Sequence, residues 1–326
     1  MSTIKKITLF VILIILFRLP VFAQNKQPGY GFSVAPSFGA ISGQAIEIVY
    51  KAYSDKLMSK LLWDLKPLFY AGLAADFGPV DDFSKHGFVG NLSFKMGIPQ
   101  RTGTMEDMDW MYSYSDTLLT NYSRHNNFSE RSILADVSLG WSFHISDFIA
   151  FGPDINFSYM HYYWIAKDGY YQYVDGDKNG PFPGQVWTDS IPKVPFSGPV
   201  CEYTQDWYVF SPGVFVKFRL SRFFILNGSF NYSPLIFGED TDKHLGLGDI
   251  YNDDFSYGHY FKGGGGITFS PMSNLDITLS LLYSYITDSK GDIYKNSVKH
   301  PSQAAGGGYD ALDIGLSVRL RLSGRR

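Results

Sequence analysis

The chain has few of the features that mark disulfide-stabilised or nucleic-acid-binding proteins. One cysteine, Cys201, stands alone among 326 residues, so neither an intrachain disulfide nor a cysteine-based metal cluster can form. We interpret it as a bystander thiol. Neither sign of charge dominates, because 28 basic and 31 acidic residues leave a formal net charge of -3. This balance predicts no basic surface for nucleic acid.

Long apolar runs are also absent beyond the N-terminus. Lys5 and Lys6 precede a continuous apolar run over 7–17, and Ala23 ends a small-residue cleavage site. The run is too short for a spanning helix, which needs about 20 residues, so we predict a signal peptide over 1–23. An uncleaved anchor is the alternative. With no later spanning run, an exported soluble protein or a membrane β-barrel remains.

Aromatic residues, in contrast, are abundant. They make up 17% of the chain, while all charged residues together make up 18%. Membrane barrels carry girdles of aromatic side chains at both lipid–water interfaces, so a barrel accounts for this excess. A soluble aromatic-rich sandwich is the alternative on composition alone.

The main structural signal is an alternation of apolar and polar residues with period two, which predicts β-strands. Alternating runs of this kind occupy 133–143, 226–233 and 275–285. Soluble sandwich strands also alternate, but they average about five or six residues, whereas a strand tilted across a bilayer needs about 9–11. These runs are long enough to favour a membrane barrel. The clearest run has an aliphatic residue at every second position: Leu312, Ile314, Leu316, Val318, Leu320 and Leu322.

The alternation and the connections between runs predict an all-β fold, a transmembrane antiparallel up-and-down β-barrel of about ten strands with 24–326 as one domain. When the ten candidate strands are counted in chain order, the connections after the even-numbered strands are short, as periplasmic turns are. Those after odd-numbered strands are long and polar, as extracellular loops are, and cover 42–60, 100–130, 163–206, 238–257 and 288–308. Side chains largely fill a barrel of this size, so we expect no wide pore. The candidate strands are 30–41, 61–76, 86–99, 131–144, 148–163, 207–220, 223–237, 257–270, 275–287 and 309–323.

Two long loops carry paired groups that are suited to hydrolysis. Asp107 and Asp109 are two residues apart, so both carboxylates point to one side of an extended segment. Asp242 and His244 have the same spacing, and a carboxylate beside an imidazole is a common general-base arrangement. Each pair by itself is more often an ordinary polar loop. If all the long loops lie at one mouth, however, the two pairs meet there.

The same loops contain motifs that resemble those of the omptin family of outer-membrane proteases. Asp107–Met111 resembles the family's Asp-x-Asp-Trp-Met motif, Ser123–His125 its Ser-Arg-His, and Asp240–His244 its Asp-x-Asp-x-His. Residues 37–50, which include Glu47, are similar to the first-strand region of the family. The matches occur in the family's order and span the mature chain.

This resemblance implies an aspartyl-type endopeptidase in the cell outer membrane, with its active site facing outside. Asp107 and Asp109 would form one side of the catalytic site, and Asp242 with His244 the other. A water molecule held between the pairs would give its proton to His244, while Asp242 orients the imidazole.

The resemblance also implies substrate-binding and supporting residues. Glu47 and Asp240 match the family's acidic pocket for an Arg or Lys side chain before the cut bond. Ser123 and His125 match positions that support the site, and Ser123 is not expected to act as a nucleophile. The expected partners are polypeptides with basic residues and the outer-membrane lipid, and no nucleic acid.

Two departures from the family pattern bear on substrate choice and on cofactors. Asn121 stands where the family usually has an acidic residue, which puts in doubt a basic preference after the cut. Phe157, Tyr159, His161 and Asp206 occupy positions where relatives bind lipopolysaccharide phosphates with basic side chains. We therefore expect no cofactor and no dependence on lipopolysaccharide.

Two other functions compete with the protease. A catalytically silent barrel used for adhesion or structure would suit the long Tyr-rich loops, although it has no need to keep all four catalytic residues. A metal-dependent hydrolase is the other, since three carboxylates and one imidazole are possible ligands of a divalent ion.

Overall fold

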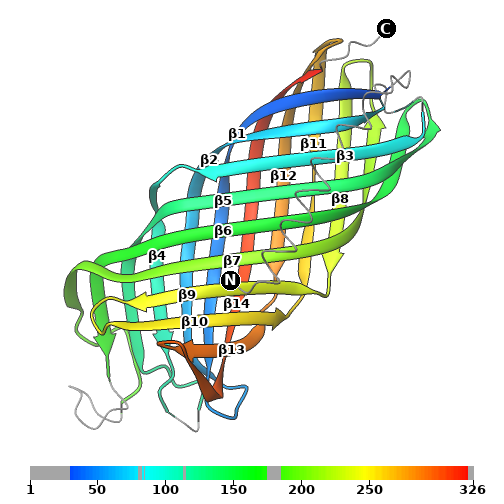
Figure 1. The fold of residues 1–326 in the computed structure, drawn as a ribbon. Helices are drawn as coiled ribbons and strands as arrows, with labels where there is room; N and C mark the ends of the chain where they lie inside the picture. The colour runs from blue at the N-terminus through cyan, green and yellow to red at the C-terminus, as the bar shows by residue number, and fades with distance from the viewer. Residues whose placement is uncertain (1–29, 80–82, 84, 113–114, 175–184, 322–326) are drawn as a thin grey trace.

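The computed structural model describes residues 30–79, 83, 85–112, 115–174 and 185–321, and every regular element in this part is a β-strand (Figure 1). None of the described residues lies in a helix long and apolar enough to cross a membrane. The proposed signal peptide, 1–23, lies outside the described residues, so the division at residue 24 stays a prediction.

Fourteen strands follow one another along the described residues, and each hydrogen-bonded pair of strands is antiparallel. The strands are β1 (Tyr30–Tyr50), β2 (Leu57–Pro79), β3 (Gly87–Gly97), β4 (Gln100–Asp109), β5 (Asn121–Ser146), β6 (Ile149–Tyr173), β7 (Val194–Arg219), β8 (Phe224–Ser233), β9 (Ile236–His244), β10 (Asp249–Tyr257), β11 (Tyr260–Met272), β12 (Leu275–Ile286), β13 (Lys290–Lys295) and β14 (Val298–Arg321).

The sheet closes on itself because β1 pairs with β14 from Ser33↔Arg321 to Val49↔Ala305. In the half with the short turns, the ring runs β1-β2-β3-β5-β6-β7-β8-β11-β12-β14. In the other half, here called the outer half, β4 replaces β3, and β9, β10 and β13 replace β8, β11 and β12. The ring therefore has ten strands in both halves, as the sequence predicts, and closure leaves no unpaired edge.

The long outer loops predicted from the sequence are wrong in extent, because most of their residues continue the strands. In the outer half, β1 extends to Tyr50, β4 to Asp109, β6 to Tyr173, β9 to His244 and β13 to Lys295 before the chain turns back. The predicted strands ended where their apolar faces ended. A wall beyond the membrane needs no apolar outer face, so its strands continue with polar side chains on both sides. The outward-facing pair Lys243 and Glu202, whose Nζ and Oε2 atoms lie 3.0 Å apart, is an example.

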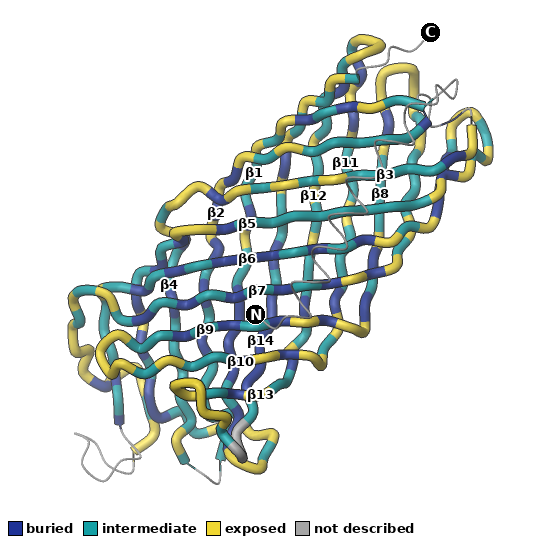
Figure 2. The backbone as a smooth tube through the Cα atoms, in the orientation of Figure 1, coloured by how far each residue is buried: buried dark blue, intermediate teal, exposed yellow. Residues whose placement is uncertain are grey.

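The half with the short turns carries a belt of exposed apolar side chains, which a wall facing lipid requires. Figure 2 colours the exposed positions along the strands yellow, between less exposed positions in teal and dark blue. The belt alternates along each strand with side chains that face the lumen. It includes Phe32, Phe38, Leu73, Phe94, Phe151, Phe210, Val214, Phe230, Leu281 and Leu316.

Inside the belt, the lumen contains partly buried ion pairs and buried tyrosines. Lys262 Nζ lies 2.5 Å from Asp136 Oδ1, and Lys95 pairs with Asp313 across the barrel. Toward the outer half, the tyrosine hydroxyls of Tyr162 and Tyr309 lie 2.7 Å apart.

We predict that Lys262→Met destabilises the barrel by about 3–5 kcal/mol, because it leaves the Asp136 carboxylate buried without its cation. Denaturant unfolding in detergent micelles measures this change. The control Lys299→Met breaks an ion pair whose side chains are 54% and 50% exposed, and should change stability by less than about 1 kcal/mol. Equal effects of both substitutions would contradict the assignment.

Candidate functional site

One side of the candidate site is the end of β4. Asp107 and Asp109 occupy alternate positions on this strand, so both carboxylates face the lumen. β2 and β5 flank them: Ser59 lies opposite Asp109 on β2, and its hydroxyl donates to Asp107 Oδ1 over 3.3 Å. On the other flank, Asn121 pairs with Asp109 and hydrogen-bonds to its carboxylate. This is the Asn121 that departs from the family pattern.

The other side is the end of β9. His244 Nε2 lies 2.5 Å from Asp242 Oδ2, so this nitrogen holds the bridging proton. The Asp242 side chain is only 3% exposed, whereas that of His244 is 38% exposed. The carboxylate therefore fixes the imidazole from the buried side, and the rest of the ring remains accessible.

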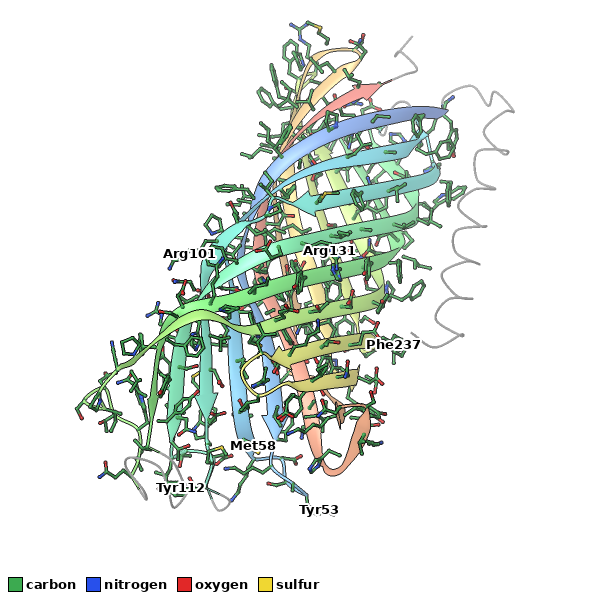
Figure 3. The ribbon with its side chains drawn as sticks, turned by 60° about the vertical axis from the view of Figure 1, so that its left-hand side comes forward. Tyr53, Met58, Arg101, Tyr112, Arg131 and Phe237 are labelled. Carbon is green, nitrogen blue, oxygen red and sulfur yellow. The ribbon has the colours of Figure 1, made fainter. Side chains whose placement is uncertain are left out.

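The two sides meet across the lumen. β5, β6 and β7 separate β4 from β9 along the sheet, yet Asp107 interacts electrostatically with both Asp242 and His244. In Figure 3, Tyr53, Met58 and Tyr112 mark the end of the barrel where this site lies, while Arg101 and Arg131 lie farther along the wall. The structure thus brings together the four residues that the sequence analysis proposed as catalytic.

Burial and like charge shift the protonation of these groups. Burial raises the pKa of Asp107 well above its usual range, and the charge of Asp109 adds to this shift. Burial also raises the pKa of Asp109 to about 6, although hydrogen bonds from Ser59 and Asn121 oppose it. Burial lowers the pKa of His244, but the bond to Asp242 and the nearby carboxylates outweigh it, so the net pKa lies above its usual value.

Cys201 is not a bystander, which corrects the interpretation from sequence. It lies on β7 opposite His244, is 3% exposed, and its thiol donates to Asp242 Oδ1. Burial raises the pKa of Cys201, and the charge of Asp242 raises it further, so the thiol stays protonated. Asp242 is therefore held on one oxygen by Cys201 and on the other by His244.

A second acidic group lies close to these residues and contains Glu47 on β1 and Asp240 on β9. They are 3% and 5% exposed. Trp63 Nε1 donates to Glu47 Oε2 over 3.4 Å, and the Tyr203 hydroxyl donates to Asp240 Oδ2 over 2.8 Å. Burial raises the pKa of both carboxyl groups, and neighbouring carboxylates raise each further.

A third member of this group, Asp253, was not predicted from the sequence. It lies on β10 directly opposite Asp240 and is 3% exposed. Burial raises its pKa to about 8, with the charges of Asp242 and Asp254 adding to the shift. In sequence it is one of two consecutive aspartates in an expected loop. Only the register of the β9–β10 hairpin shows that it faces Asp240.

Ser123 and His125 lie beside the site on β5, where Ser123 pairs with Asp107. His125 Nδ1 lies 2.8 Å from the Asp168 carbonyl and donates to it, so Nε2 can accept from the Ser123 hydroxyl at 3.1 Å. Burial lowers the pKa of His125, which favours this neutral form. The pair lines the Asp107 side, where the sequence analysis expected a supporting role.

The positions compared with lipopolysaccharide-binding residues lie elsewhere, on the wall formed by β6 and β7. Asp206 Oδ1 accepts from the Tyr159 hydroxyl at 2.7 Å and lies 2.9 Å from His161 Nδ1. Arg131 Nε donates to His161 Nε2 over 3.0 Å. Phe157 continues the same row of alternate positions on β6.

Comparisons with known proteins agree with this architecture. The plasminogen activator of Yersinia pestis is 25% identical over 275 residues, which cover 82% of this chain and 80% of that protein. The crystal structure of the outer membrane protease OmpT from Escherichia coli has a TM-score of 0.77 and 18% identity, and the match covers 90% of this chain and 97% of that one. The model of the omptin family matches residues 29–318. The chain therefore belongs to the omptin family, the proteases built on an outer-membrane β-barrel.

Proposed function

We propose that this protein is an endopeptidase that cleaves polypeptides after Arg or Lys by means of a water molecule activated between Asp107/Asp109 and Asp242/His244. One observation carries the proposal. Two carboxylates from β4 and a carboxylate–imidazole pair from β9 face each other across the outer lumen, and the imidazole is accessible.

The roles follow from where the protons lie. With Nε2–H held by Asp242, the lone pair of neutral His244 is on Nδ1, which takes the proton of the attacking water. The water oxygen adds to the scissile carbonyl carbon. The positive charge that develops on the imidazole is stabilised by Asp242, which in turn accepts a bond from Cys201.

Asp107 and Asp109 act as a pair that shares a proton, because two neighbouring buried carboxylates do not both ionise readily. The protonated member donates to the carbonyl oxygen as negative charge develops there, and the ionised member holds the water. The carbonyl oxygen then returns its proton to the aspartate pair as the C–N bond breaks, and the proton taken up by His244 passes to the leaving amine, which completes hydrolysis.

The basic side chain before the cut bond binds the acidic group. Glu47 and Asp240 are buried next to Asp242, so a cation that binds them holds the following peptide bond near His244. Charge-assisted bonds to two carboxylates suit a guanidinium or an ammonium group.

We predict that Asp107→Asn and His244→Gln each lower kcat/KM by about 100- to 10,000-fold, because each removes a group that transfers or shares a proton. A quenched peptide with Arg-Ala at its centre and the barrel refolded in detergent provide the assay. Asp189→Asn, at an exposed turn position before β7, is the matched control and should cleave like the unchanged protein.

Cleavage that survives both site substitutions would remove the mechanism. Adding a chelator tests the competing function, a metal-dependent hydrolase. We expect the same rate of cleavage with and without the chelator. Loss of cleavage on adding the chelator would instead favour the metal-dependent hydrolase.

The rate should fall on the acid side at a pH above the usual imidazole value of about 6.5. His244 must be neutral to accept a proton, and its pKa is raised, so the active form is lost as pH falls through that raised value. A profile of kcat/KM between about pH 5 and 9 measures this fall in rate on the acid side. A flat rate from mild acid to neutral pH would contradict His244 as the base.

We also propose that the enzyme needs no lipopolysaccharide. A phosphate group of lipopolysaccharide would require a cation on the wall formed by β6 and β7, but Asp206 places a carboxylate there. This carboxylate is already bonded to Tyr159 and His161. In micelles free of lipopolysaccharide, we expect the same kcat/KM before and after the lipid is added. A rate that appears only with the lipid would refute this independence.

A further inference from the structure

The acidic group next to the catalytic residues contains three carboxylates, of which the sequence motifs name only two. Asp253 on β10 is the direct partner of Asp240 on β9, and Glu47 from β1 interacts electrostatically with both. The next residue, Asp254, is exposed on the opposite face of the strand. Asp253 therefore points inward because of its position in the β9–β10 hairpin.

These three carboxylates lack cationic partners. Among the described residues, neither Lys nor Arg forms an ion pair with Glu47, Asp240 or Asp253. Their main electrostatic neighbours are other carboxylates, including Asp242. Asp240 and Asp253 lie close enough for a side-chain hydrogen bond when one of the two carboxyl groups is protonated.

Oxygen atoms of this pair are also left without donors. Asp240 Oδ1 and Asp253 Oδ1 are buried, and no donor among the described residues reaches either atom. Asp240 Oδ2, by contrast, accepts from the Tyr203 hydroxyl at 2.8 Å. Leaving buried acceptors unpaired is unfavourable, so a ligand that brings two donors at once is strongly favoured here.

Two of the three carboxylates accept hydrogen bonds from buried aromatic side chains. Trp63 Nε1 donates to Glu47 Oε2, and the Tyr203 hydroxyl donates to Asp240 Oδ2. The Trp63 and Tyr203 rings are stacked with centroids 4.8 Å apart, so each ring helps to hold the other, and the carboxylate that it bonds, in place.

We propose that Asp253 is a specificity-determining residue that makes the protease prefer Arg over Lys before the cut bond. This inference rests on the proposed function. A guanidinium presents its N–H donors as a fork, so it bonds to Asp240 Oδ1 and Asp253 Oδ1 together when both carboxyl groups are ionised. An ammonium places its charge at one point on a flexible stem. It pairs with Glu47 and Asp240 and depends less on Asp253.

The test compares two peptides that differ only in having Arg or Lys before the cleaved bond. We expect the unchanged enzyme to prefer Arg. Asp253→Asn, which keeps the shape and removes the charge, should lower kcat/KM for the Arg peptide by about 10- to 100-fold. It should affect the Lys peptide much less, so the Arg-to-Lys preference largely disappears. Asp254→Asn is the matched control and should keep both rates.

A residue with a merely structural role would lower both rates together and leave the preference unchanged. Asp253→Glu provides a rescue variant, because it restores the charge and should recover part of the Arg preference. It also serves as the second variant if Asp253→Asn does not fold.

The outcomes separate this inference from the proposed function. If the unchanged enzyme cleaves beside Arg but Asp253→Asn keeps the Arg-to-Lys ratio, the role of Asp253 is wrong and the protease assignment stands. If the unchanged enzyme cleaves neither peptide, the proposed function fails and this inference fails with it.

Discussion

The β1–β14 pairing holds the rest of the structure together, because it turns an open sheet into a ring along nearly the whole length of both strands. A closed ring satisfies every inter-strand hydrogen bond within the wall, which lipid requires of any spanning sheet. The same pairing continues past the apolar belt into the outer half. There the ring remains rigid although its outer face is polar, and it fixes side chains from opposite walls at short distances across a narrow lumen.

That rigidity allows like charges to accumulate. Glu47, Asp107, Asp240, Asp242 and Asp253 all face the outer lumen, and four of them have a raised pKa because burial and mutual repulsion disfavour their ionised forms. On a flexible loop, these carboxylates would separate into water. On paired strands they cannot separate, so binding a cation or sharing a proton is favourable because either one relieves their mutual repulsion. The belt lumen uses the opposite solution, in which carboxylates pair with cations: Asp136 with Lys262, Asp313 with Lys95, and Asp276 with Arg321.

Asp242 links the two uses of charge. It orients His244 through one oxygen, accepts the Cys201 thiol on the other, and raises the pKa of Glu47 in the acidic group. Binding a basic side chain there neutralises charge next to the imidazole. In the proposed function, substrate recognition and water activation are therefore coupled through one carboxylate, and Asp253 completes the recognition part.

The sequence by itself determined the strands of the membrane half, and it determined that the two members of each catalytic pair lie on the same side of their strand. Period-two alternation follows from lipid on one side of a strand, and Asp107/Asp109 and Asp242/His244 share a side because their spacing is two. Tertiary structure decided what spacing cannot express. The strands continue beyond the belt, where no apolar face marks them, and hairpin register sets Asp253 against Asp240. Strand pairing likewise brings Cys201 to Asp242, 41 residues away in sequence. Such contacts depend on which strands become neighbours, and local alternation carries no information about that.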